Sequence, residues 1–305
     1  MSPSNRKDRR PRGAHKRSAS NANSLRLGRS NIKVIYEDRS LMAIDKPPGW
    51  LITTPKWSRT QQNLQREIEL GILRGDDWAR QRQLRYLRFV HRLDRETSGV
   101  LLLAKNRHTL SRLSRLFTHQ AVNKAYLCIV KGHPDVPTWE CKAPLAPVSG
   151  KASRMAVNRN NGKPAETQFQ VLHAGTEQSL IVAFPQTGRT HQIRVHLKHC
   201  GLPILGDPLY GPASKTTPAQ RRNERSPRPS ATTNLALRAW GLRFPHPQNG
   251  RPLLIEAETA AFLRDYPIRV PKLDLAALLN HASPRSKSRA QSSSEIDGLS
   301  NFTPA

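Results

Sequence analysis

The sequence predicts an α+β fold with a mainly antiparallel sheet, and two observations lead to this class. Short β-type apolar runs outnumber helical patterns along the 305 residues, and the connections between them are short. No strand–GxGxxG–helix unit and no GxxxxGK[ST] motif occurs, so dinucleotide-binding and P-loop NTPase functions have no support. No internal repeat is visible.

The predicted strands are short runs rich in β-branched and other apolar residues, bounded by polar turns. The first two runs flank a four-residue polar turn and therefore predict a hairpin. In chain order the predicted strands are Ile32–Tyr36, Leu41–Asp45, Leu87–Val90, Val100–Ala104, Ala125–Val130, Thr167–Leu172, Ser179–Phe184, Leu235–Leu242 and Pro252–Ala257.

Helices are predicted where apolar residues recur every three or four positions after a residue that can cap a helix. Thr60, Asn106 and Thr190 are the expected N-caps, and Gly201 is the expected stop of the third helix. Two short helices are expected to close the folded body. The positions that predict these helices are Leu64, Ile68 and Ile72; Leu110, Leu113, Leu116 and Phe117; Ile193, His196, Leu197 and Cys200; Ala260–Asp265; and Leu273–Leu279.

The chain is strongly basic, with 50 Lys and Arg against 22 Asp and Glu and a formal net charge of +28. Such a charge indicates a polyanionic partner, with nucleic acid before a membrane surface. Residues 1–30 are predicted to be a disordered basic arm that contacts RNA, and a targeting segment stays open as the alternative. Residues 31–283 are predicted to form one folded domain with a basic low-complexity insert at 214–233. Residues 284–305 are predicted to be a disordered tail.

Several classes are disfavoured by composition. No apolar run approaches the ~18 residues of a membrane span, and no apolar segment typical of a secretory signal follows Met1. The three cysteines (Cys128, Cys141 and Cys200) are widely spaced and odd in number, which fits a reduced compartment. We therefore expect a cytoplasmic protein. The His and Cys residues within 191–200 lack zinc-protease spacing and nearby carboxylates, so no metal is expected.

Two segments carry candidate chemistry. The first is HRLDRETSG at residues 91–99, where Asp94 lies in a bend between two predicted strands. On its own this segment could equally be a salt-bridged turn whose carboxylate bonds local N–H groups. The second is GRTHQIRVHL at residues 188–197, with Arg189 at the mouth of a predicted helix. On its own it could equally be an amphipathic helix with a basic outer face.

Together these segments resemble a known family. HRLDRETSG at 91–99 and GRTHQIRVHLKHCGLPILGDPLYG at 188–211 are similar to the two signature blocks of the RluA family of RNA pseudouridine synthases. The resemblance extends over about residues 31–265 and makes 31–283 the catalytic domain. It implies the pseudouridine synthase fold, with a mixed, mainly antiparallel sheet in two halves, flanking helices and a central RNA-binding cleft. Shorter similar blocks are DKPPG at 45–49, KAY at 124–126, LRA at 237–239 and FPHP at 244–247.

The resemblance implies that a uridine in structured RNA, ribosomal or transfer RNA, is isomerised to pseudouridine without cofactor or metal. Asp94 matches the catalytic aspartate, which either attacks C1′ or takes a proton from C2′. Tyr126 matches a tyrosine that stacks on the uracil near the departing C5 proton. Arg194 matches the cation beside the aspartate, which opposes the rise in pKa that burial causes.

The resemblance also suggests substrate contacts. Arg92 matches a residue that fills the gap left by the extruded base. Arg189 is expected to contact a phosphate or a secondary carboxylate, and Leu197 is assigned to substrate binding as well. Arg238 departs from the family pattern, because a His is usual at that position.

No accessory RNA-binding domain is recognisable, so target choice is expected to rest on the folded body, the insert and the basic ends. A monomer without an obligate protein partner is expected. The alternative hypothesis is a catalytically silent RNA-binding or chaperone protein on the same fold, which would not need Asp94, Tyr126 and Arg194 together. A hydrolytic glycosylase could also use one carboxylate, but it is disfavoured because the second carboxylate usual for polysaccharide hydrolysis is not recognised and the blocks of such enzymes do not match.

Overall fold

The structure is a computed structural model that describes residues 23–53, 62–150, 154–212, 234–264, 266, 268 and 272–281. The predicted tail at 284–305 and insert at 214–233 lie outside these residues, as does most of the predicted arm. The rest of the arm is folded: Ser24–Leu27 forms strand β1, where Leu25 and Leu27 are 0% and 1% exposed. The expected boundary at residue 30 is therefore wrong, because these two leucines belong to the core.

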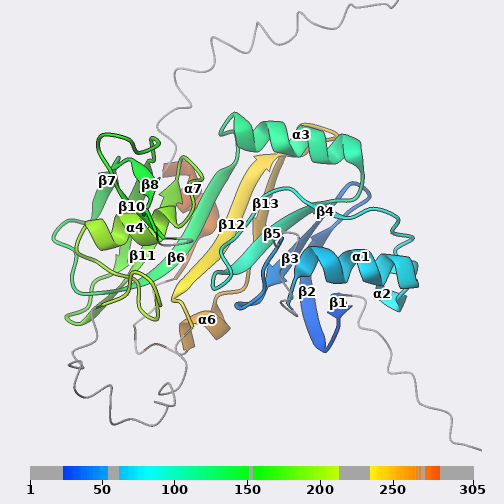
Figure 1. Cartoon of the computed structure of the whole chain (residues 1–305), viewed down its shortest axis with the longest axis horizontal. Helices are drawn as coiled ribbons and strands as arrows, with labels where there is room; N and C mark the ends of the chain where they lie inside the picture. Colours follow the sequence, from blue (N-terminus) through cyan, green and yellow to red (C-terminus); the bar gives the residue numbers. More distant parts are fainter. Residues whose placement is uncertain are drawn as a thin grey trace, which may run out of the picture.

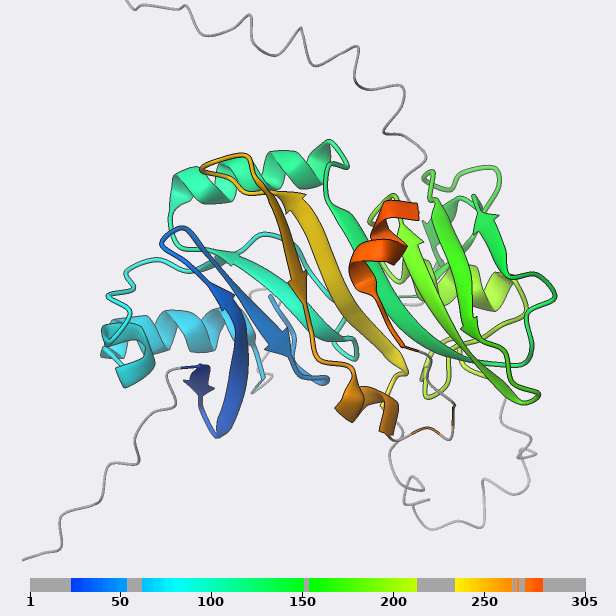
Figure 2. The same cartoon turned by 180° about the vertical axis from the view of Figure 1, so that it is seen from behind.

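One large sheet runs through the molecule, with α1 and α4 on the face seen in Figure 1 and α7 on the face seen in Figure 2. The helices are α1 Leu64–Arg74, α2 Asp77–Arg80, α3 Arg107–Thr118, α4 Gln192–His199, α6 Ala260–Arg264 and α7 Leu275–His281. The strands are β1 Ser24–Leu27, β2 Ser30–Glu37, β3 Leu41–Lys46, β4 Arg88–Phe89, β5 Ser98–Ala104, β6 Asn123–Lys131, β7 Thr138–Cys141, β8 Leu145–Pro147, β9 Met155–Val157, β10 Thr167–His173, β11 Gln178–Pro185, β12 Leu237–Pro245 and β13 Pro252–Glu256.

The strand order is β1-β2-β3-β5-β12-β6-β11-β10-β7, with β4 beside β5 and β13 beside β12. Among the described strands β5 and β12 pair in parallel, and the other pairs are antiparallel. The parallel ladder is short, joining Ser98 to Arg238 and Gly99 to Ala239. It divides the sheet into one half built from β1 to β5 and another built from β6, β7 and β10 to β13, while β8 and β9 form a separate two-stranded sheet. The predicted α+β class, with a mainly antiparallel mixed sheet, is confirmed.

Two of the three expected helix caps are wrong. Asn106 caps α3 as expected, and its side chain accepts a hydrogen bond from Thr109 N at 2.8 Å. Helix α1, however, begins at Leu64 and is capped by Asn63 rather than by Thr60, which lies outside the described residues. Because a cap needs extended backbone directly before the first helical turn, the residue adjacent to Leu64 takes the role.

Helix α4 also begins later than expected. Its N-cap is His191, which has a left-handed backbone with φ 55° and makes no side-chain capping bond. Thr190 instead accepts a hydrogen bond from the Arg92 guanidinium. Gly201, with φ +78°, ends the helix as expected.

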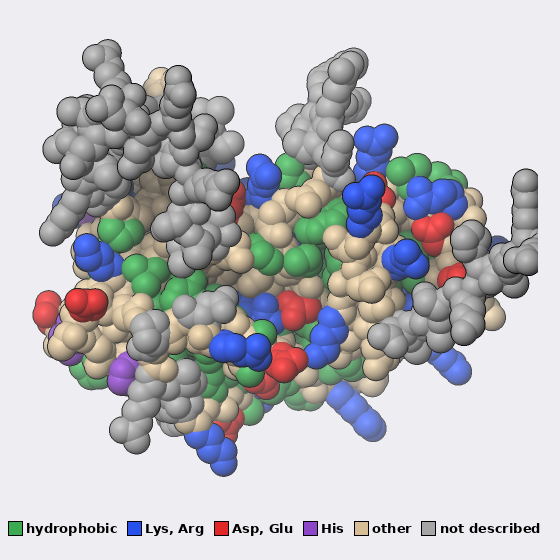
Figure 3. Space-filling view, turned by 90° about the horizontal axis from the view of Figure 1, so that it is seen from below, with side chains coloured by type: hydrophobic (Ala, Val, Ile, Leu, Met, Phe, Trp, Pro, Cys, Tyr) green, Lys and Arg blue, Asp and Glu red, His purple; other side chains and the backbone are tan. Residues whose placement is uncertain are grey.

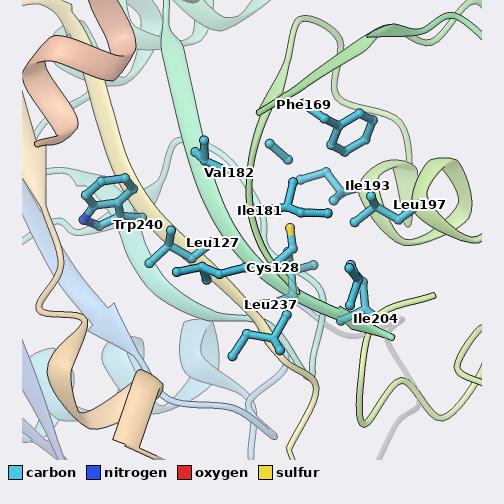
Figure 4. Packing of buried hydrophobic residues seen from close by; sticks show 14 of the residues in the cluster. Leu127, Cys128, Phe169, Ile181, Val182, Ile193, Leu197, Ile204, Leu237 and Trp240 are labelled. Atoms are coloured by element: carbon cyan, nitrogen blue, oxygen red, sulfur yellow. The ribbon is translucent and has the colours of Figure 1, made fainter. Parts of the chain in front are cut away.

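Helix α4 is buried along almost its whole length. Ile193 and Leu197 pack into the main core cluster beside Ile181 and Phe169 (Figure 4). Arg194 and His196 are also buried, with 1% and 0% exposure. A buried polar group is costly unless it is hydrogen-bonded, so the partners of these side chains fix how α4 sits on the sheet. None of the helices in the described part of the chain is long and apolar enough to cross a membrane.

Gly99 provides a test of the parallel junction. It has φ +110°, and a Cβ at this position would lie 2.1 Å from the Ala239 carbonyl oxygen. Gly99→Ala must therefore push β5 away from β12, and we expect the free energy of unfolding to fall by about 3 kcal/mol. Denaturant titration followed by circular dichroism measures the loss.

Gly250→Ala is the matched control. Gly250 also has a positive φ, +69°, but apart from its chain neighbours no atom lies within 4 Å of the point where a Cβ would stand. We expect this variant to lose only about 1 kcal/mol, the usual cost of a left-handed backbone. Equal losses in the two variants would contradict the close approach at the junction.

Candidate active site

A cavity of about 490 Å³ lies where loops from the two halves of the sheet meet. Asp94 comes from the loop between β4 and β5, Tyr126 from β6, and Arg189 from the loop between β11 and α4. These three residues and Arg92 all line the cavity. The structure thus brings together four of the residues that the sequence predicted, from segments far apart in the chain.

The carboxylate of Asp94 is bound by a buried guanidinium. Arg194 Nη1 donates to Asp94 Oδ2 at 3.1 Å. Arg194 Nε and Nη2 donate to the two carboxylate oxygens of Asp207 at 2.7 and 2.8 Å. The side chains of Arg194 and Asp207 are 0% exposed, whereas that of Asp94 is 24% exposed. The predicted pair of Asp94 and Arg194 is therefore present, and Asp207 adds a bidentate contact that the sequence reasoning missed.

The charge state of this trio follows from its contacts. Burial alone would lower the pKa of Arg194, but the hydrogen bonds and negative charge of Asp207, helped by Asp94, raise it above its ordinary value. Burial would likewise raise the pKa of Asp207, and the bonds from Arg194 reverse this and hold that pKa below its usual range. Arg194 is consequently a permanent cation beside Asp94.

Tyr210 supports Arg194 from the loop after α4. Its ring centroid lies 5.2 Å from the Arg194 guanidinium carbon, which is a cation–π distance. Its hydroxyl accepts a hydrogen bond from Met155 N at 2.7 Å and lies 2.9 Å from His191 Nδ1. His191 Nε2 is 3.9 Å from Asp94 Oδ2, and burial lowers the pKa of this imidazole.

A buried lysine fixes the loop that carries Asp94. Lys46 on β3 is 0% exposed. Its Nζ donates to the carbonyl oxygens of Pro47, Arg95 and Thr97 at 3.1, 2.9 and 2.8 Å. Burial lowers the pKa of Lys46 to about 8, against the opposing charges of nearby acids. The backbone just after Asp94 is thereby held, while Asp94 Oδ1 has no hydrogen-bond partner among the described residues.

Tyr126 and Lys124 lie two positions apart on β6, so they share one face of the strand, and both line the cavity. Burial, followed by the charges of Asp94 and Cys128, raises the pKa of Tyr126. Its phenol is therefore protonated at neutral pH and can donate a hydrogen bond. Lys124 Nζ donates to Thr187 O at 3.1 Å, and burial lowers the pKa of Lys124 to about 8.

The two rim arginines are exposed and tethered. Arg92 donates to Thr190 Oγ1, and Arg189 Nε donates to Pro164 O at 2.9 Å. In the described part of the chain Arg189 meets a backbone carbonyl and no carboxylate, so its expected contact with a secondary carboxylate is absent there. No group of three or more His, Cys, Asp and Glu residues able to hold a metal occurs among the described residues.

Leu197 is not part of the cavity. Its side chain is 0% exposed and belongs to the main core cluster (Figure 4). The assignment of Leu197 to substrate binding is therefore wrong, because a side chain without exposed surface cannot touch a substrate. Its helical neighbours explain the error: Arg194 turns toward Asp94, and Leu197 follows Ile193 into the core.

The mixed sheet, the cavity at the meeting point of its halves and the Asp94–Arg194 pair define a pseudouridine synthase domain. A model of the family described as RNA pseudouridylate synthase matches residues 40–199. The chain belongs to this family, and its curated relatives place it in the RluA group.

Two relatives and one solved structure illustrate the similarity. Ribosomal large subunit pseudouridine synthase C of Vibrio cholerae is 36% identical over 231 residues, which cover 75% of this chain and 66% of that protein. Ribosomal large subunit pseudouridine synthase D of Nitrosomonas europaea is 36% identical over 231 residues, covering 74% and 61%. The chain thus spans slightly less than two thirds of their length. Human RNA pseudouridylate synthase domain containing 1 shares the fold, with a TM-score of 0.61 at 24% identity, covering 88% of this chain and 98% of that one.

Asp207→Asn tests the buried ion pair, since it removes a charge while keeping the side-chain shape. A guanidinium left under-compensated is strongly destabilising, so we expect the free energy of unfolding at pH 7 to fall by about 3 kcal/mol. The pKa of Asp207 is lower in the folded protein than in the unfolded chain, where it is about 3.9. Its contribution is therefore fully present above about pH 4 and is lost as the pH falls toward the folded pKa.

The loss in Asp207→Asn should accordingly shrink when urea titrations are repeated between pH 6 and pH 3. Glu258→Gln is the control, because the exposed Glu258 also pairs with a base, Lys33, at 3.0 Å. Exposed pairs contribute little, so we expect no measurable loss from this variant. If the loss in free energy of unfolding caused by Asp207→Asn stays constant over this pH range, the lowered pKa of Asp207 does not contribute to stability as stated.

Proposed function

We propose that the chain isomerises uridine in RNA to pseudouridine and that Asp94 is the carboxylate that acts on the ribose. One observation carries the proposal. Asp94 Oδ2 is held at 3.1 Å by a buried cation, while the side chain stays 24% exposed at the wall of the cavity. A carboxylate that is oriented from behind and open in front suits attack on a bound substrate.

The reaction needs one carboxylate and no cofactor. The N1–C1′ bond of uridine breaks while Asp94 either forms a bond to C1′ or removes the proton from C2′. The uracil then turns so that C5 faces C1′, and the C5–C1′ bond forms as the Asp94–C1′ bond breaks or as C2′ regains its proton. The proton leaves C5, and N1, no longer bonded to the ribose, takes up a proton. The cavity volume of about 490 Å³ is within the range of pockets that enclose small molecules, as a base taken out of its stack requires.

The other cavity residues have roles that fit their positions. Tyr126 stacks on the uracil, and its phenol keeps its proton because burial raises its pKa. The exposed guanidinium of Arg92 fills the gap that the base leaves in the RNA, which lowers the cost of extrusion. Arg189 contacts a phosphate at the rim, where a planar guanidinium can make two hydrogen bonds.

The substrate we propose is structured RNA, with ribosomal RNA first, because the curated relatives are named for the large ribosomal subunit. The net charge of +28 supports a polyanionic partner. Figure 3 shows Lys and Arg side chains spread over one face among apolar and acidic ones rather than in one patch. Such a spread suits contact with an extended backbone. The proposed setting is a cytoplasmic monomer.

Asp94→Asn tests the proposal with RNA that carries tritium at C5 of uridine. Tritium release should fall by at least about 1000-fold, as expected when a group acting on the reacting atom is lost. Glu96→Gln is the matched control, because Glu96 lies in the same loop, 3.7 Å from Arg194, and the variant makes the same change of charge. We expect Glu96→Gln to retain most of the activity.

Two outcomes of this assay exclude the proposal. Full release from Asp94→Asn would remove Asp94 from the chemistry. No release from the wild-type protein with any cellular RNA, while RNA is still bound, would favour the alternative of a catalytically silent RNA-binding protein. The melting temperature of each variant shows that the fold is retained.

Arg189→Ala tests the proposed phosphate contact. We expect weaker RNA binding. The slope of log Kd against log salt concentration should fall by about one, which is the contribution of one phosphate contact. The single-turnover rate at saturating RNA should change little, since the contact is made equally in substrate and transition state. Arg251→Ala, an exposed residue outside the cavity, is the control. An unchanged salt slope in Arg189→Ala would contradict the assignment.

A further inference from the structure

A second cavity, of about 650 Å³, lies beside the edge strand β7 and shares no residue with the active-site cavity. Cys141 and Cys200 both line it. Of the three free cysteines, Cys128 is 0% exposed in the core, Cys141 is 6% exposed at the edge of the core, and Cys200 is half-buried. The proposed RNA chemistry uses neither of the two thiols.

The fold brings the two thiols together from distant segments. Cys141 ends β7 and pairs with Thr167 of β10. His196 on α4 lies 3.0 Å from Thr167 Oγ1 and 2.9 Å from Ala143 O, so α4 packs directly against the segment at Cys141. Cys200 follows His196 by four residues and therefore lies one turn further along the same face of the helix. Both side chains thus face the same cavity, where each affects the pKa of the other.

The surroundings shift the pKa values of the two thiols in opposite directions. The hydrogen bond from Cys200, helped by His196 and the backbone N–H of Ala143, holds the pKa of Cys141 well below its usual range. The same hydrogen bond and burial raise the pKa of Cys200. The pKa of Cys128, by contrast, is raised by burial alone. A low-pKa thiol beside a second thiol is the arrangement of reactive cysteine pairs.

The charges around the cavity select the reagent. Lys142 pairs with Glu140 at 2.7 Å, whereas Arg159 is exposed at the wall and has no carboxylate partner among the described residues. An exposed guanidinium attracts small anions. A metal is disfavoured, because both ring nitrogens of His196 already contact oxygens and no three-ligand cluster occurs in the described part of the chain.

We propose that Cys141 and Cys200 form a redox-active dithiol site that reacts with small anionic disulfides of the oxidised glutathione type. The Cys141 thiolate attacks one sulfur of the disulfide, forms a mixed disulfide and releases one thiolate. Cys200 then gives its proton to solvent and attacks Cys141 Sγ, which releases the second thiolate. The protein gains a Cys141–Cys200 disulfide, and the reagent is reduced to two thiols.

The test treats the reduced full-length protein with oxidised glutathione at pH 7 and follows free thiols and intact mass. We expect two of the three thiols to disappear together, a mass decrease of two hydrogens, and a single cross-linked peptide pair that contains Cys141 and Cys200. The melting temperature should rise by several degrees, because the disulfide constrains the unfolded chain. A dithiol reductant should reverse every change.

Four variants locate the reactivity. Cys128→Ala should form the same cross-link at the same rate. Cys200→Ser should stop at a stable mixed disulfide on Cys141. Cys141→Ser should react several-fold more slowly than Cys128→Ala or Cys200→Ser. Arg159→Gln should slow the attack of Cys141 on the disulfide several-fold at low salt. The rate should then be close to that of the wild-type protein at high salt.

Several results would overturn the proposal. They are equal reactivity of all three thiols, a cross-link that forms only in urea or between molecules, a mixed disulfide in the wild-type protein that does not resolve, and a lowered melting temperature after oxidation. None of these readouts depends on RNA modification, so failure of the proposed function would leave the outcome unaffected.

Discussion

The buried guanidinium of Arg194 is the contact on which the site depends. It donates two hydrogen bonds to Asp207 and one to Asp94, and no part of its side chain reaches solvent. A single buried cation facing a single acid would leave no net charge to attract or stabilise a developing positive centre. Because Asp207 neutralises Arg194, the trio keeps one negative charge, and the partly exposed Asp94 is where that charge meets the cavity.

This contact also joins the halves of the sheet. Asp94 precedes β5 in one half, and Arg194 lies on α4 over the other, so their hydrogen bond crosses the short parallel ladder of β5 and β12. Lys46 holds the Asp94 loop from β3 through three backbone carbonyls. The site thus exists only when both halves are in register, since neither half alone places a carboxylate and its cation together.

Local patterns in the sequence predicted most of the sheet and the cap at Asn106. The grouping of Asp94, Tyr126 and Arg194 was implied by the family resemblance, and the structure brings the three together. The short strands β1, β7, β8 and β9 and the one-turn helix α2 were missed, because three or four residues carry too little periodicity. The role of Asp207 was missed because a lone acid after a helix has many uses. The clue to the role of Asp207 was that a buried cation such as Arg194 needs a further partner besides the partly exposed Asp94. Thr190 was misassigned as a cap because the left-handed backbone of His191 delays the helix start. Leu197 was misassigned because it follows Ile193 into the core.

Arg238, where the family pattern usually has a His, lies between strands of the sheet and away from the candidate active site. Its guanidinium donates to Asp45 on β3, Ser98 on β5 and the Glu258 carbonyl, at 2.7, 3.3 and 2.9 Å. An imidazole has only two nitrogens and could not reach all three partners. Arg238 is also absent from the lining of the active-site cavity. Arg238 therefore links three neighbouring strands where the two halves of the sheet meet, so the substitution changes the contacts between the halves. Its partner Asp45 is adjacent to Lys46, which holds the Asp94 loop.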